Sequence, residues 1–188
     1  MKISNTIKIT KLLALLFIST LTFTACSDDH DDDDHEHEEE LITTVNYTLT
    51  DGSNEIILTF SDPDGEGGND GTYTVSSALT ASTTYTGEIE LLNESESPAE
   101  DITDEIREED DEHEFFYSSS VSGIAINKTD TDEDGNPVGI ETTLTTGAAG
   151  SGTITIILKH EPTKPNNNTA ADAGGSTDVE VTFNIEVQ

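Results

Sequence analysis

Glutamate and histidine side chains in the middle of the chain could bind a metal ion. Glu105, Glu109 and either Glu112 or His113 recur at helical spacing, which would stack them on one stripe of a helix. His160 ends a run of alternating apolar residues and is expected at the inward end of a strand. Imidazole and carboxylate are the usual zinc ligands, so this set predicts a Zn²⁺ site. The alternative, which the sequence by itself favours, is a capped core histidine paired with one glutamate, because nothing in the sequence fixes the distance between His113 and His160.

A second candidate is a calcium-type loop. Its alternating acids, glycine and distal glutamate are Asp130, Asp132, Asp134, Gly135 and Glu141. This spacing lets oxygen ligands converge on Ca²⁺, although Pro137 and Gly139 forbid the exit helix of an EF-hand. The alternative is a polar hairpin turn, for which Asp-Gly is favoured. A similar acidic turn holds Asp62 and Asp64, and the same two interpretations apply to it.

The N-terminal segment contains a third set of ligand types. Every residue from Asp28 to Glu40 is Asp, Glu or His, including His30, His35 and His37. Such a tract cannot bury itself, so residues 26–41 are predicted to form a disordered tether. The tract is expected either to bind Zn²⁺, Cu²⁺ or Ni²⁺ weakly or only to keep the chain soluble.

Residues 1–25 have the organisation of a secretory signal. A lysine-rich start precedes a short apolar run and small residues just before Cys26. We therefore predict cleavage before Cys26 and lipidation of its sulfur, which would anchor the chain in a membrane. Because Cys26 is the only cysteine, its lipidation would leave no thiol for a disulfide or a zinc cluster.

The charge of the mature chain excludes one class of partner. Beyond residue 25 the sequence retains four basic and 40 acidic residues, a net charge of −36 with neutral histidines. Such a surface repels nucleic acid and favours cations or basic protein surfaces.

Residues 42–188 are predicted to form one all-β domain. Apolar residues alternate with polar ones in several segments, most regularly at the C-terminus, where Val179, Val181 and Phe183 point inward while Asp178 and Glu180 point outward. Many short strands with one polar face favour an antiparallel, immunoglobulin-like β-sandwich, with a barrel as second choice. Residues 98–111 are the exception, because Ser97, Pro98 and Glu100 predict a helix start.

The sequence contains none of the common hydrolase, metalloprotease or phosphate-binding motifs. We therefore expect a protein that is not an enzyme. The absence of Trp also argues against a stacking platform for carbohydrate.

Several short segments resemble a family of small acidic lipoproteins of flavobacteria and other Bacteroidetes, often loosely labelled type 1 periplasmic binding domain proteins. They are FSDPDG (60–65), YTGEI (85–89), DITDEI (101–106), EHEFF (112–116), GNPVG (135–139) and LKHEP (158–162). The label says little about fold, because the full type 1 solute-binding fold is α/β and much longer. Ser27-Asp28-Asp29 also resembles the acidic export signal of surface-exposed Bacteroidetes lipoproteins. This resemblance implies an outer-membrane lipoprotein facing outward, with a periplasm-facing one as the alternative.

Two functions remain open. The first is an accessory lipoprotein that binds Zn²⁺, Cu²⁺ or Ca²⁺ beside an outer-membrane receptor or transporter. The second is a protein-interaction or adhesion module of the cell surface that uses loops or a sheet edge and needs no metal.

Overall fold

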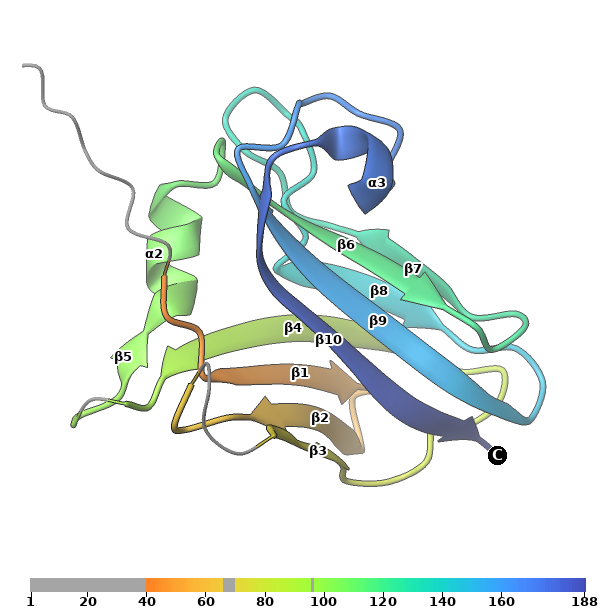
Figure 1. Ribbon diagram of the computed structural model, residues 1–188. Helices are drawn as coiled ribbons and strands as arrows, with labels where there is room; N and C mark the ends of the chain where they lie inside the picture. The colour runs from red at the N-terminus through yellow and green to blue at the C-terminus, as the bar shows by residue number, and fades with distance from the viewer. Residues whose placement is uncertain (1–39, 66–69, 96) are drawn as a thin grey trace, which may run out of the picture. The chain divides into compact units, whose positions relative to one another are not determined.

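The computed structural model describes residues 40–65, 70–95 and 97–188, which form two antiparallel β-sheets and two short helices. The larger sheet has the order β3-β2-β1-β4-β8-β7, with β5 also paired to β4. The smaller sheet has the order β10-β9-β6 (Figure 1). The strands are β1 (Thr44–Thr50), β2 (Glu55–Ser61), β3 (Thr72–Val75), β4 (Thr84–Asn93), β5 (Glu100–Asp101), β6 (His113–Ser119), β7 (Ala125–Lys128), β8 (Glu141–Thr145), β9 (Gly150–His160) and β10 (Ser176–Val187).

The alternation of apolar and polar residues determines which face of each strand is buried. In β4, Tyr85, Ile89 and Leu91 are buried, while Glu88 and Glu90 are exposed. The inward faces of both sheets meet in one core, whose largest side chains are Tyr47, Tyr85, Phe115 and Phe183. Each such side chain contributes about 1.5–3 kcal/mol when it leaves water. The predicted antiparallel β-sandwich is therefore confirmed.

The helical insertion is confirmed, but it starts later than predicted. Helix α2 spans Ile102–Glu108, and the carboxylate of Asp101, not the hydroxyl of Ser97, accepts a hydrogen bond from the Thr103 backbone N–H. The residues just before α2 pair with β4 as β5, which keeps them extended and delays the first turn. Ile102 and Ile106 are both buried, as expected for residues that share a helix face.

A second helix was not expected. Helix α3 spans Ala170–Ala173, and only Ala173 is buried. One helical turn is too short to show a periodic pattern, so this helix has no detectable signal in the sequence. No helix among the described residues is long and apolar enough to cross a membrane.

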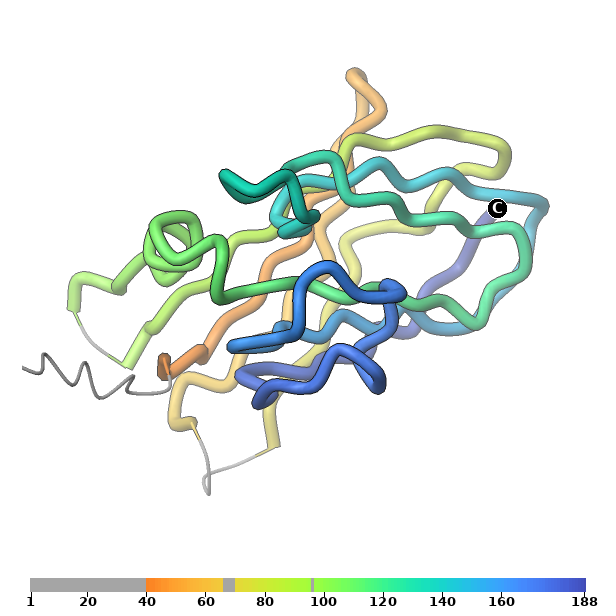
Figure 2. The backbone as a smooth tube through the Cα atoms, turned by 90° about the horizontal axis from the view of Figure 1, so that it is seen from above, coloured from red at the N-terminus to blue at the C-terminus, as the bar shows by residue number. Residues whose placement is uncertain are grey.

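The ends of several elements meet at one place. β6 begins, β9 ends and β10 begins at the same end of the smaller sheet. Helix α2 lies at that end and leads directly into β6 (Figure 1, Figure 2).

Candidate metal centre

The pairing of β6 with β9 places His113 directly opposite His160. Both residues are buried, and their imidazole rings stack with centroids 4.7 Å apart and an angle of 15° between the ring planes. The sequence could not supply this distance, because it depends on strand register. The structure therefore brings together the two histidines that sequence reasoning singled out.

The backbone at the end of α2 orients the His113 ring. Glu109 is the C-cap of α2, and its carbonyl oxygen lies 3.1 Å from His113 Nδ1. A carbonyl oxygen only accepts hydrogen bonds, so Nδ1 carries a hydrogen and donates it. In the neutral ring the lone pair is then on Nε2, which is the arrangement found for histidines that bind metal.

His113 Nε2 faces two buried carboxylates. It lies 3.6 Å from Glu40 Oε1 and 3.9 Å from Asp178 Oδ2, and the three side chains are 0%, 8% and 0% exposed respectively. His113 Nε2 and Glu40 Oε2 are buried without a hydrogen-bond partner. One ligand atom each from Glu40, Glu109 and His113 lie within 4.8 Å of one another. We refer to Glu40, Glu109, His113 and Asp178 as the inner group.

The electrostatics of the inner group favour a protonated His113 imidazole beside an ionised Glu40 carboxylate. Burial by itself lowers the pKa of His113, but the Glu40 carboxylate, the Glu109 carbonyl and the Asp178 charge outweigh it and raise that pKa. His113 in turn lowers the pKa of Glu40 against the opposing effect of burial. Burial raises the pKa of Glu105, and the charges of Glu40 and Glu109 add to the effect. The charges of the inner group thus reach Glu105, which is not among the three residues whose ligand atoms lie within 4.8 Å of one another.

His160 has its own set of carboxylates. Its Nε2 lies 3.6 Å from Glu112 Oε2, and one ligand atom each from Glu112, His160 and Glu161 lie within 4.8 Å of one another. We refer to these three residues as the outer group. Glu161 has φ +51° and its backbone N–H donates to the Glu112 carbonyl at 2.6 Å, which joins the end of β9 to the turn before β6.

Sequence reasoning missed Glu40, Glu161 and Asp178 as members of these groups. The prediction that Asp178 points outward is wrong: the pairing of β10 with β9 shifts register between Thr177 and Val179, so its side chain is fully buried. A bulge of this kind has no sequence signal here. Glu40 has no sequence signal that separates it from the acidic tether before it. Glu161 does have one, because it directly follows His160 and the two form an adjacent pair of ligand types.

The predicted calcium loop has a different geometry. The Asp130 carboxylate accepts hydrogen bonds from the backbone N–H groups of Gly139 and Ile140, at 2.8 and 2.9 Å. The Asp132 carboxylate accepts one from the Asn136 backbone N–H at 2.7 Å and pairs with Lys164.

The other two acids of that loop, Asp134 and Glu141, are exposed. Among the described residues, the four loop acids do not bring three ligand atoms together at metal-binding distances. Gly135 has φ +84°, and its backbone N–H donates to the Asp132 carbonyl, as in the hairpin-turn alternative.

The second acidic turn lies beside the inner group. Asp62 lines a cavity of about 440 Å³ together with Glu40 and Asp178, while Asp64 is exposed. Burial raises the pKa of Asp62, and the neighbouring charges of Asp64 and Asp70 add to it. Glu40 and Asp178 are thus the two members of the inner group that line this cavity.

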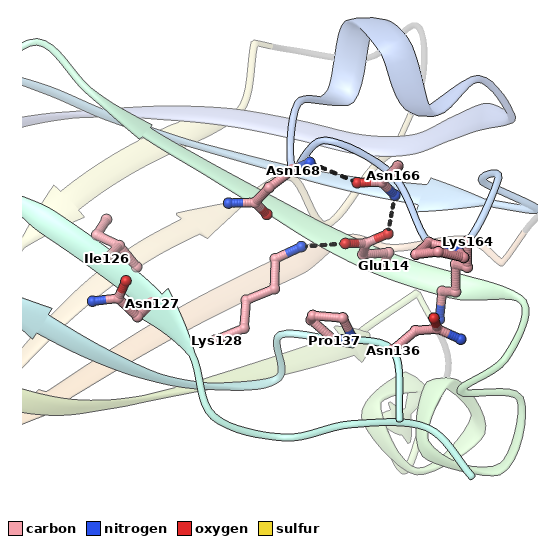
Figure 3. Close-up of a pocket in the computed structure, with 10 residues that line it drawn as sticks. Glu114, Ile126, Asn127, Lys128, Asn136, Pro137, Lys164, Asn166 and Asn168 are labelled. Atoms are coloured by element: carbon pink, nitrogen blue, oxygen red, sulfur yellow. Dashed lines mark hydrogen bonds and ion pairs between the residues drawn. The ribbon is translucent and has the colours of Figure 1, made fainter. Parts of the chain in front are cut away.

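Another cavity, of about 200 Å³, is not suited to a metal cation. Lys128 and Lys164 line it, and the Lys128 ammonium pairs with Glu114, whose carboxylate also accepts from the Asn166 side-chain amide (Figure 3). Lys128 also lies 4.3 Å from the centroid of the Phe116 ring. The acid in this cavity is therefore already neutralised by a buried lysine.

The predicted lipidation site Cys26 and the tether histidines His30, His35 and His37 lie outside the described residues. Comparisons of the chain with protein-family models, with characterised proteins and with solved structures gave no match.

Proposed function

We propose that this chain is a membrane-anchored lipoprotein that binds a divalent transition-metal cation in its folded domain. Its role is binding rather than catalysis, as an accessory to metal uptake at the outer membrane. The observation that carries the proposal is the Nε2 atom of His113, which is buried and faces the buried carboxylates of Glu40 and Asp178.

The donor atoms of the inner group favour a positive charge between them. A lone pair on Nε2 and two carboxylates repel one another, and a proton or a metal ion among them removes this repulsion. The N···O separations of 3.6 and 3.9 Å exceed those of ordinary N–H···O hydrogen bonds, which are about 2.7–3.2 Å. A tetrahedral Zn²⁺ ion with ligand bonds of about 2.0–2.2 Å holds its donor atoms about 3.3–3.6 Å apart. The 3.6 Å separation from Glu40 therefore lies at the upper end of the range for a shared metal ion, and the 3.9 Å separation from Asp178 must shorten by a few tenths of an ångström for both carboxylates to bind it.

The types of ligand favour Zn²⁺ or Cu²⁺ over Ca²⁺. Imidazole suits the first two ions, whereas Ca²⁺ prefers six to eight oxygen ligands. The inner group offers one nitrogen and three carboxylates. Its nitrogen is already oriented by the Glu109 carbonyl, which reduces the cost of ordering the site.

The predicted anchor and tether would support the same role. A lipid on Cys26 would hold the domain at the membrane, and the acidic tract with His30, His35 and His37 would raise the local concentration of cations near Glu40. We place the protein on the outer membrane, facing outward, beside a receptor or transporter that accepts the ion.

The test is native mass spectrometry on the chain from Ser27 onward, with His30, His35 and His37 replaced by alanine so that the tether contributes no imidazole. We expect Zn²⁺ to remain bound through buffer exchange and to be lost after His113→Ala. Glu186→Gln, which removes an exposed carboxylate at the far end of β10, is the matched control and should retain Zn²⁺. Unchanged Zn²⁺ binding in the folded His113→Ala protein would contradict the proposal and favour the adhesion-module alternative.

A further inference from the structure

The outer group repeats the key geometry of the inner group. His160 Nε2 lies 3.6 Å from Glu112 Oε2, the same separation as between His113 Nε2 and Glu40 Oε1. Glu161 adds a third ligand atom, as Glu109 does on the inner side. Each of the two stacked imidazoles thus has its own carboxylates.

The balance of charge favours more than one ion. The inner and outer groups together hold five carboxylates, Glu40, Glu109, Glu112, Glu161 and Asp178, around two imidazoles. An ion at the inner group lies among Glu40, Glu109 and Asp178, whereas Glu112 and Glu161 lie beside the other imidazole. Because like charges repel one another, a second ion between Glu112 and Glu161 would relieve a repulsion that the first ion does not reach.

Resting on the proposed function, we infer that this cluster binds two divalent cations, one at the inner group and one at the outer group. The two imidazoles that would hold these ions stack with their centroids 4.7 Å apart. Both positions offer one imidazole with carboxylates, so both take the same class of ion, Zn²⁺ or Cu²⁺.

The two positions differ in their access to solvent. His113, Glu40 and Asp178 are at most 8% exposed. At the outer position the Glu112 side chain is 36% exposed and Glu161 is exposed. The outer ion therefore exchanges faster and binds more weakly, which suits it to be the position where an ion arrives and leaves.

The experiment is a calorimetric titration with Zn²⁺, combined with native mass spectrometry, on the same chain lacking the tether histidines. We expect two ions in the parent and one in His160→Ala, with the tighter site retained. Glu161→Gln changes an exposed side chain and does not endanger folding, so it serves as the second variant. It should weaken only the second ion, by about tenfold or more.

The outcomes separate this inference from the proposed function. If the parent binds one ion and neither His160→Ala nor Glu161→Gln changes its binding, the outer position is overturned and the inner site stands. Two ions that persist in both variants would overturn the assignment of the second position to the outer group. No bound ion in the folded parent would overturn both proposals.

Discussion

Replacing Glu40 by glutamine tests the inner group with the least change in shape. The amide keeps the size of the side chain, removes its charge, and leaves His113 and its hydrogen bond to the Glu109 carbonyl in place. Because the Glu40 carboxylate is nine-tenths buried beside His113 Nε2, little solvent screens its attraction for an ion at that position. Zn²⁺ affinity should therefore fall sharply in Glu40→Gln.

The size of the effect follows from the distances. Two unit charges about 4 Å apart attract by about 4 kcal/mol at an effective dielectric constant of about 20. A divalent ion doubles this gross attraction, and a ligand bond of about 2.0–2.2 Å raises it further. Dehydration of the ion and of the carboxylate offsets much of it. Loss of an outer-shell partner of a metal ligand already costs about 10–100-fold in affinity, so loss of a direct ligand should cost at least about 100-fold. That ratio corresponds to about 2.8 kcal/mol.

The assay is a calorimetric titration with Zn²⁺ on the chain lacking the tether histidines, with Glu186→Gln as the control. The same variant should lower the pKa of His113, because the Glu40 carboxylate is the largest influence that raises it. Histidine NMR signals followed against pH in metal-free protein would report this change. An affinity within about threefold of the parent, with an unchanged His113 pKa, would refute the geometry described for Glu40.

Three further predictions concern the stability of the domain. In metal-free protein, the raised pKa of His113 stabilises the fold fully below pH 6.5, the ordinary pKa, and this stability is lost as pH rises through the raised pKa. The lowered pKa of Glu40 stabilises the fold fully above pH 4.5, the ordinary pKa, and this stability is lost as pH falls through the lowered pKa. Urea unfolding at a series of pH values should therefore show a maximum between these limits, and saturating Zn²⁺ should remove the loss on the alkaline side. Lys128→Met leaves the buried Glu114 carboxylate without its ion-pair partner and should cost about 3–5 kcal/mol in the free energy of unfolding; a loss below about 1 kcal/mol would contradict the buried pair. Asp101→Ala removes the N-cap of α2 and should cost about 1 kcal/mol, measured by the same denaturation, with no loss expected if the cap were elsewhere.

The strands and their buried faces were largely predictable because they depend on a local pattern, whereas the order of the strands was not. Val181, Phe183 and Ile185 alternate with Thr182 and Asn184, and a strand with that pattern has only one way to bury its apolar face. The helix was harder to place, since the start signal at Ser97 precedes the observed N-cap, Asp101, by four residues. Pairing of Glu100 and Asp101 with β4 delays the helix, and no local sequence pattern records that pairing.

The candidate metal centre was predictable only in part. His113 and His160 could be chosen from their positions in strands, but their contact depends on the register of β6 against β9. Asp178 enters the site because a register shift reverses the direction that simple alternation predicts for it. Glu40 enters because the folded domain retains the last residue of an otherwise uniform acidic run. Neither feature has a signal in composition or spacing.

The most direct test of the central claim is zinc X-ray absorption spectroscopy on the chain without tether histidines, loaded with one equivalent of Zn²⁺. A site at the inner group predicts one imidazole nitrogen together with carboxylate oxygens, at about 2.0–2.2 Å from the ion. The imidazole contribution should disappear in His113→Ala. A spectrum with oxygen ligands alone, the same in the parent and in His113→Ala, would mean that the ion lies among surface carboxylates, and it would contradict a metal centre built on His113.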